Sequence, residues 1–394
     1  MSQMKSYSFQ GKRAVIRVDF NVPLHKETLE VQDDKRIKAA LPTINWVLNH
    51  GGSVVLLSHF GRPKNGPEDR FSLRHVLVRL QELLGVSVAF SLTLEEGFLK
   101  SKELNAGDIM LMENVRFFKG ETENNSTLSA EFAKLGDCFI NDAFGSAHRA
   151  HSSTTGIASF FPNDRMMGFL MEEELNNAQR VLSNPSSPFT AIIGGAKVSD
   201  KMLIIENLVS IASDIIIGGG MAYTFAQAMG GQIGNSLVEE DRLDNVKTIL
   251  SQANQKGVRL HLPVDSVIAD SFSADASTQI TSSHHIPKGW MGLDIGPNSI
   301  DDFKKVILSS KTVLWNGPMG VFEWEPFSRG TRDIALAVAE ATSLGAYSLI
   351  GGGDSASAIA QFALVDKVSY VSTGGGALLE LFEGKELPGI KALD

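Results

Sequence analysis

The most constraining feature of this sequence is a repeated alternation of short apolar runs with longer segments of helical periodicity. Runs rich in β-branched and aliphatic residues occur at 13–18, 53–57, 86–90, 109–112 and 138–141. After residue 185 the alternation begins again, with runs at 190–194, 214–218, 259–264, 312–316, 347–351 and 369–373. Near-continuous apolar strands between helices are typical of parallel sheets covered on both faces. The pattern therefore predicts an α/β protein with two lobes, each a parallel sheet with helices on both faces.

The segment 164–182 between the two series has a helical pattern of its own. Leu170, Leu175, Ala178 and Leu182 recur at helical spacing, and S-N-P-S-S-P at 183–188 then breaks the pattern. We predict an interdomain helix that ends near Ser183. A chain of 394 residues also exceeds the roughly 250–300 residues that one core usually serves. We therefore expect an N-terminal domain at 1–168, the interdomain helix and hinge at 169–185, a C-terminal domain at 186–376 and a C-terminal segment at 377–394.

Composition excludes several classes of function. The formal net charge is −9, which argues against nucleic acid or an anionic membrane as the main partner. Cys138 is the only cysteine, so an internal disulfide and a multi-cysteine zinc site are excluded, and we expect this thiol to be buried. The N-terminus has no secretory leader pattern, and no window approaches the ~18 apolar residues of a membrane span. We expect a soluble cytoplasmic protein.

Cationic side chains follow the predicted strands of the first lobe. Ligands of open parallel sheets bind at the carboxyl ends of the strands. A lone arginine would usually pair with an acid, but Arg62, Arg116 and Arg149 together predict a site for a small, multiply anionic metabolite, because guanidinium binds carboxylate and phosphate bidentately. For His148 and His151 the sequence leaves two roles open, contact with a ligand and capping of a loop. The candidates at these strand ends and at the first helix start are Asp19, Asn21, Arg36, His59, Arg62, Asn114, Arg116, Asp142, His148, Arg149 and His151.

The second lobe carries glycine-rich segments after its strands. They begin at Gly194, Gly218, Gly351 and Gly374, and Lys197 and Lys201 are spaced one helical turn apart. Glycine lets backbone approach a ligand closely, and amides that open a helix attract phosphate. The combination predicts a polyphosphate ligand such as a nucleotide.

Three further polar residues follow the strands of this lobe. Asn316 and Glu323 come after the run 312–316, and Asp354 lies in G-G-G-D-S. Asp354 is the acid best placed to meet a nucleotide-bound magnesium ion, and it would also serve as a cap for the following helix. The familiar P-loop, dinucleotide-binding and protein-kinase motifs are absent from the sequence.

These segments together resemble the phosphoglycerate kinase family, in its compact bacterial form. The resemblance implies a phosphotransferase with a carboxyl group as acceptor, which converts 1,3-bisphosphoglycerate and ADP to 3-phosphoglycerate and ATP with Mg²⁺ in glycolysis. The matching motifs, in the order and spacing of the family, are R-V-D-F-N-V-P (17–23), S-H-F-G-R-P (58–63), E-N-V-R-F (113–117), A-H-R-A-H-S-S (147–153), G-G-A-K-V-S-D-K (194–201), W-N-G-P-M-G-V-F-E (315–323), G-G-G-D-S (351–355) and S-T-G-G-G-A (372–377).

The resemblance also implies roles for individual residues. Glu323 would contact the ribose, Asp354 would help to hold magnesium, and Ser355 stands where family members often have threonine. The implied catalytic residues are Arg36, Lys201, Gly375 and Gly376, with Gly374 also in the loop that receives the phosphoryl group. The implied triose site comprises Asp19, Asn21, Arg36, His59, Arg62, Arg116 and Arg149. The implied nucleotide site comprises Lys197, Lys201, Gly292, Asn316, Glu323, Gly351, Gly352, Gly353, Asp354 and Ser355.

The expected mechanism is direct in-line transfer after hinge closure, with charge stabilised by Arg36, Lys201 and helix N-terminal amides near Gly375. The family also returns its last residues to the N-terminal domain, and a monomer is expected. An NAD-dependent dehydrogenase is the alternative function, which the missing dinucleotide fingerprint disfavours. A non-catalytic binding protein on the same fold is disfavoured because Arg36, Lys201 and Asp354 are all present.

Overall fold

The computed structural model describes residues 3–64 and 66–394. Its chain divides into two compact units. Unit 1 comprises Met1–Asn176 and Glu386–Asp394, and unit 2 comprises Asn177–Lys385. The border between the units falls inside helix α6 (Phe169–Leu182). Of the predicted C-terminal segment, residues 377–385 group with unit 2 and only 386–394 group with unit 1.

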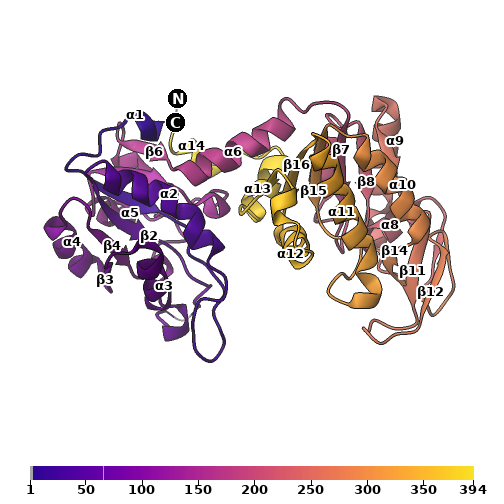
Figure 1. The fold of residues 1–394 in the computed structure, drawn as a ribbon, viewed down its shortest axis with the longest axis horizontal. Coiled ribbons are helices and arrows are strands. Elements are labelled where there is room, and N and C mark those ends of the chain that lie inside the picture. Colours follow the sequence, from indigo (N-terminus) through magenta and orange to yellow (C-terminus); the bar gives the residue numbers. More distant parts are fainter. Residues whose placement is uncertain (1–2, 65) are drawn as a thin grey trace. The chain divides into compact units, whose positions relative to one another are not determined.

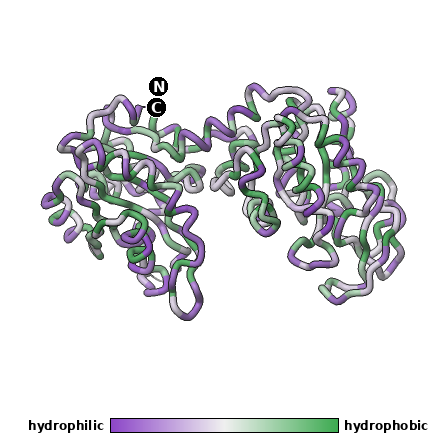
Figure 2. The backbone as a smooth tube through the Cα atoms, in the orientation of Figure 1, coloured by the Kyte–Doolittle hydropathy of each residue, from purple (hydrophilic) through white to green (hydrophobic). Residues whose placement is uncertain are grey.

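Unit 1 is built on a six-stranded parallel sheet in the order β3-β4-β2-β1-β5-β6 (Figure 1). All five residues of β2 are buried, because this strand lies between two others and under helices on the sheet faces. Figure 2 shows hydrophobic residues concentrated along the strands of the sheet. The strands are β1 (Arg13–Arg17), β2 (Ser53–Leu57), β3 (Ala89–Ser91), β4 (Ile109–Met112), β5 (Cys138–Asn141) and β6 (Arg165–Met167).

One helix of unit 1 shows how an apolar stripe is buried. In α2 (Lys35–Asn49), Ile37, Ala40, Ile44 and Val47 recur every three or four residues and are all buried. The other helices are α1 (Gln3–Ser6), α3 (Arg74–Leu84), α4 (Leu94–Glu103), α5 (Ser126–Ala133) and α14 (Pro388–Lys391). Cys138 is buried, as expected from its apolar surroundings.

The chain returns to unit 1 at its C-terminal end. Gly389 of α14 donates its amide to the Ala147 carbonyl at 2.8 Å, and Asn141 Nδ2 donates to the Gly389 carbonyl at 3.1 Å. Arg165 of β6 also hydrogen-bonds the Asp394 carbonyl. The last nine residues therefore form part of this unit through specific backbone contacts.

Unit 2 contains a second six-stranded parallel sheet, in the order β10-β8-β7-β15-β16-β17 (Figure 1). Its strands are β7 (Phe189–Ile193), β8 (Asp214–Ile217), β10 (Arg259–His261), β15 (Thr312–Asn316), β16 (Tyr347–Gly351) and β17 (Tyr370–Val371). Its helices are α7 (Met202–Leu208), α8 (Met221–Ala228), α9 (Leu243–Lys256), α10 (Pro297–Leu308), α11 (Arg329–Ser343), α12 (Gly353–Gln361) and α13 (Gly376–Phe382). Within the described parts of the chain, no helix has both the length and the apolar character needed to cross a membrane.

The structure adds strands that the sequence does not predict. A three-stranded antiparallel sheet joins β11 (Asp265–Ala269), β12 (Thr278–Ser282) and β14 (Met291–Ile295), and β9 (Gln232–Ile233) pairs with β13 (His285–Ile286). Most of β12 is exposed, so it lacks the continuous apolar run by which buried strands are recognised. Strand β6 occupies the first residues of the segment 164–182, and α6 then runs from Phe169 to Leu182, as expected for a helix that ends near Ser183.

Candidate functional sites

Unit 1 brings its predicted polar residues to one edge of the sheet. Arg17, the last residue of β1, is in register with Leu57 of β2 and Asn141 of β5. Parallel strands in this register end at the same level. The segments that follow them, which begin near residues 18, 58 and 142, therefore leave the sheet side by side.

Asp19 organises the first of these segments. Its Oδ2 accepts from Arg36 Nη1 at 3.1 Å, and its Oδ1 accepts from the Asn21 amide at 3.1 Å and lies 4.0 Å from His59 Nδ1. Burial alone would raise the pKa of Asp19, but the charges of Arg36 and Arg17 and the hydrogen bond from the Asn21 amide outweigh burial and hold this pKa below its ordinary value. Asp19 is thus an ionised carboxylate that aims Arg36 from the start of α2.

The loop after β2 is fixed by Asn114. Its Oδ1 accepts from the Phe60 amide at 3.1 Å, and its Nδ2 donates to the Phe60 carbonyl at 2.6 Å. Gly61 adopts φ +58°, and a Cβ there would lie 2.3 Å from the Phe71 ring, so the turn requires glycine. The Gly61 amide donates to Asn21 Oδ1 at 2.8 Å, and Arg116 donates to the Gly61 carbonyl. These bonds place His59, Arg62 and Arg116 in one region.

Arg17 is a functional candidate that the sequence does not indicate. It lies within the apolar run 13–18, and although it is charged, it is only 1% exposed. Its Nε donates to Ser153 Oγ at 2.9 Å, and its Nη2 lies 3.2 Å from His59 Nδ1. Burial, partly opposed by Asp19, lowers the pKa of His59 to about 3, so the ring is neutral. Because Nδ1 accepts from Arg17, the His59 proton is on Nε2.

The predicted arginines Arg62, Arg116 and Arg149 lie close to one another in unit 1. Burial, together with the charges of Arg149, Arg17 and Arg62, lowers the pKa of Arg116 to about 10. Among the described residues, no acidic side chain lies within salt-bridge distance of Arg62, Arg116 or Arg149. Repulsion among these guanidinium groups destabilises the folded state unless an anion or water compensates it. The cluster is therefore suited to bind an anion.

Glu121 is a buried acid near this cluster, and the sequence does not indicate it either. Its carboxylate accepts from Ser153 Oγ at 2.6 Å and from the Ser153 amide at 3.0 Å, and it lies 3.9 Å from His151 Nδ1. Burial, with the charges of Arg17, Arg116 and Arg149, lowers the pKa of His151 to about 4. His151 is therefore a neutral side chain in a buried network. Its neighbour His148 accepts from Arg149 Nε at 3.1 Å.

In unit 2, several glycines of the strand ends are required because the loops pack on one another. A Cβ on Gly194 would lie 2.1 Å from the Pro318 carbonyl oxygen, and one on Gly317 would lie 2.2 Å from the Gly194 carbonyl oxygen. Gly219, at φ +67°, would place a Cβ 2.5 Å from the Gly195 carbonyl oxygen. The glycines at these three positions are therefore explained by backbone packing. Gly353 and Gly375, by contrast, have open space where a Cβ would be.

Lys201 connects two of the predicted segments. Its Nζ donates to Asn316 Oδ1 at 2.6 Å, and Asn316 Nδ2 donates to the Gly351 carbonyl at 2.8 Å. Burial lowers the pKa of Lys201, while the charges of Asp200 and Asp354 oppose that shift. Lys197 and Lys201 do not share a helix, because α7 begins only at Met202, so the predicted helical spacing is wrong.

Other predicted residues of unit 2 lie at helix starts. Asp354 and buried Ser355 are in the first turn of α12, and Ser355 Oγ accepts from the Gly317 amide at 2.6 Å. Gly375 precedes α13 at φ +49°, and the Gly374 amide donates to Ser372 Oγ at 3.0 Å. Ser355 thus supports the loop after β15, and the amides at the start of α13 lie in an open turn.

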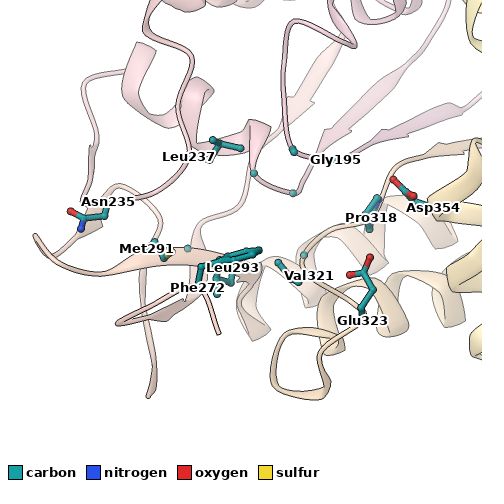
Figure 3. Close-up of a pocket in the computed structure, with 15 residues that line it drawn as sticks. Gly195, Asn235, Leu237, Phe272, Met291, Leu293, Pro318, Val321, Glu323 and Asp354 are labelled. Atoms are coloured by element: carbon teal, nitrogen blue, oxygen red, sulfur yellow. The ribbon is translucent and has the colours of Figure 1, made fainter. Parts of the chain in front are cut away.

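A cavity of about 550 Å³ opens among the loops of unit 2 (Figure 3). Three predicted residues line it: Gly292, Glu323 and Asp354. Its apolar wall was not predicted, because single apolar residues in loops form no pattern; it consists of Leu237, Phe272, Met291, Leu293 and Val321. Figure 3 shows Phe272, Leu293 and Val321 on one side of the cavity and Gly195 and Leu237 on the other. The cavity has the size and mixed character of a site for a drug-sized organic ligand.

Comparisons with known proteins find similar sequences and folds over nearly the whole chain. A family model described as phosphoglycerate kinase matches residues 4–385. Similar proteins include a phosphoglycerate kinase of Porphyromonas gingivalis, 49% identical with 99% of each chain covered, and one of Thermosipho africanus, 51% identical over 99% of this chain and 97% of the relative. The solved structure of phosphoglycerate kinase from Coxiella burnetii matches with a TM-score of 0.91 at 42% identity, covering 99% of this chain and 98% of that one.

Proposed function

Because the chain belongs to the phosphoglycerate kinase family, we propose that it transfers a phosphoryl group reversibly from 1,3-bisphosphoglycerate to ADP, giving 3-phosphoglycerate and ATP. It is a phosphotransferase that has a carboxyl group as acceptor and acts in glycolysis. The observation that carries this proposal is the division of chemistry between the units. Unit 1 gathers Arg62, Arg116 and Arg149, for which the described part of the chain offers no acidic partner, and unit 2 has a cavity lined by glycine-rich loops. A monomeric cytoplasmic enzyme is our expectation.

The triose is proposed to bind at the cationic cluster of unit 1. Arg62, Arg116 and Arg149 would bind the phosphate and carboxylate oxygens, since guanidinium groups match both geometries. Asp19 and Asn21 would accept hydrogen bonds from the glycerate hydroxyl or position the cations that bind it. His59, neutral and protonated at Nε2, would act as a hydrogen-bond donor.

The nucleotide is proposed to bind in the cavity of unit 2. Its base would lie against the apolar wall that includes Phe272 and Leu293, and Glu323 would accept from the ribose hydroxyls. Its phosphates would extend toward Lys197, Lys201 and the amides of residues 351–353, because cations and helix-opening amides favour phosphate. Asn316 and Ser355 would support these groups, as they hold Lys201 and the loop after β15.

The residues of this site are compatible with a magnesium ion that arrives with the nucleotide. Asp354 offers an exposed carboxylate that lines the cavity. Among the described residues there is no cluster of three or more metal-ligating side chains. Magnesium commonly binds through one or two carboxylates together with substrate phosphates, so a single carboxylate suffices. When bound, the ion would neutralise phosphate charge.

The transfer itself is proposed to require positioning and charge stabilisation only. An ADP β-phosphate oxygen would attack the phosphorus, and the bond from phosphorus to the acyl oxygen would break, which releases the carboxylate. Arg36 and Lys201 would neutralise the equatorial oxygens together with the amides at Gly375 and Gly376. Because each substrate has its own unit, the two units must close on one another for transfer, and closure would also exclude water from the acyl phosphate.

Thermal unfolding in the presence of ligands tests the assignment of substrates. ADP with magnesium should raise the unfolding temperature, 3-phosphoglycerate should raise it independently, and NAD should not change it. Stabilisation by NAD without stabilisation by ADP would overturn the proposal in favour of the dehydrogenase alternative.

A further inference from the structure

One aromatic wall residue of the cavity is held by a residue outside it. The Phe272 side chain lines the cavity, and this residue is 63% exposed. Its segment lies between β11 and β12. The backbone hydrogen bonds of this segment run within it, as from the Asp270 amide to the Ser277 carbonyl at 3.3 Å. The loop backbone therefore gives little support to the orientation of the ring.

The ring of Trp324 supplies that support. Its centroid lies 4.7 Å from the centroid of Phe272, with an angle of 53° between the ring planes. Trp324 contacts Phe327 in turn, at 6.3 Å between centroids, and Phe327 is fully buried in a small apolar cluster with Ala269 and Leu293. The three rings form a chain from the buried cluster to the cavity wall.

The backbone around Trp324 is fixed. The Trp324 amide donates to the Val321 carbonyl at 3.1 Å, and the Phe327 amide donates to the Trp324 carbonyl at 2.9 Å. The preceding residue, Glu323, lines the cavity, as does Val321. One short turn thus presents the Glu323 carboxylate to the cavity and, at the next position, the Trp324 indole to the Phe272 ring.

We propose that Trp324 is a positioning residue that holds Phe272 as a stacking surface and so sets the affinity of the cavity for a planar nucleotide base. The inference rests on the proposed nucleotide site. A free aromatic ring would sample several rotamers, and ordering it on binding would cost affinity; the contact with Trp324 removes that cost before the ligand arrives. The effect should depend on the base and not on the phosphates.

Calorimetric titration with two probes tests the inference. Mg-ADP contains a base, and inorganic tripolyphosphate with magnesium does not. Trp324→Ala should weaken Mg-ADP binding about two- to tenfold, the range of an aromatic pair, and leave tripolyphosphate binding unchanged. Trp324→Phe should restore most of the ADP affinity. Phe362→Ala, which removes a partly buried ring packed against another core cluster of unit 2, is the matched control and should change neither affinity.

A double-mutant cycle separates the contact between Trp324 and Phe272 from a general loss of stability. Phe272→Ala removes an exposed ring, and in that background Trp324→Ala should cause no further loss of ADP affinity. Additive losses, or an equal loss of tripolyphosphate binding, would overturn the role of Trp324. Failure of the unaltered protein to bind Mg-ADP would instead overturn the proposed nucleotide site itself.

Discussion

Asp142 lies beneath the first turn of α6 and serves as its cap. Its Oδ1 accepts from the Met171 amide at 3.1 Å, while Thr43 Oγ1 accepts from the Phe169 amide at 2.9 Å. Gly168, which precedes the helix, has no side chain with which to cap it, and a Cβ there would lie 2.2 Å from Asp142 Oδ1. Asp142 is fully buried, and its Oδ2 has no hydrogen-bond partner among the described residues.

This environment makes the stability of the protein depend on pH. Burial raises the pKa of Asp142 from an ordinary 3.8 to about 7; repulsion by Glu172 adds to this rise, and Thr43 and the amides of Leu170 and Met171 only partly oppose it. Between these two values the folded state keeps a proton that the unfolded state releases, so stability falls as pH rises through this window. The full cost, about 4 kcal/mol, is present above the folded-state pKa.

Urea unfolding of wild type and Asp142→Asn measures this contribution of Asp142 to the pH dependence of stability. Asparagine keeps an acceptor oxygen for the helix amides and has no ionisation. Between about pH 5.5 and about pH 8.5, the difference in unfolding free energy between the two proteins should change by about 2 kcal/mol. Wild type should become less stable relative to Asp142→Asn as the pH rises. Asp301→Asn, at an exposed position, should follow wild type in parallel. Parallel pH profiles for wild type and Asp142→Asn would refute the reasoning.

Four further substitutions test residues of the two sites. Arg36→Ala should lower kcat by at least a few hundred-fold with a modest change in KM, because it removes charge stabilisation from the transferring group; a loss below about tenfold in steady-state assays would remove Arg36 from that role. Arg62→Ala should raise the KM for 3-phosphoglycerate, and an unchanged KM would contradict its place in the triose site. Gly292→Ala would put a methyl group 1.9 Å from the Tyr223 hydroxyl, so it should lower the unfolding free energy by about 1–3 kcal/mol. Gly353→Ala, with open space at the Cβ position, should not, and equal unfolding curves for both would argue against this account.

The fold could be predicted well where strands are continuously apolar. β2, β4, β5, β15 and β16 have the bounds expected from their apolar runs, because both faces of each strand are covered. β12 could not be found in this way, since most of its residues are exposed and it has no continuous apolar run. Physical burial, and not chain position, therefore decides which strands a sequence reveals.

The residues of the candidate sites could be predicted only in part. Arg62, Arg116 and Arg149 were predictable because each follows a strand or the loop beyond it, and the structure groups them in unit 1. Arg17 was not, because a cation at the end of an apolar run usually marks an exposed strand end, whereas here Ser153 and His59 hold it in the interior. Contacts between such distant segments depend on tertiary packing.

The central claim is the reaction itself, and the reverse direction tests it most directly. The protein would be supplied with ATP, magnesium and 3-phosphoglycerate, and the acyl phosphate formed would be reduced by glyceraldehyde-3-phosphate dehydrogenase with NADH. We predict NADH oxidation that requires all three supplied components. No oxidation, from folded protein that still binds Mg-ADP, would contradict the claim and would mean that the cations of unit 1 bind a different anion.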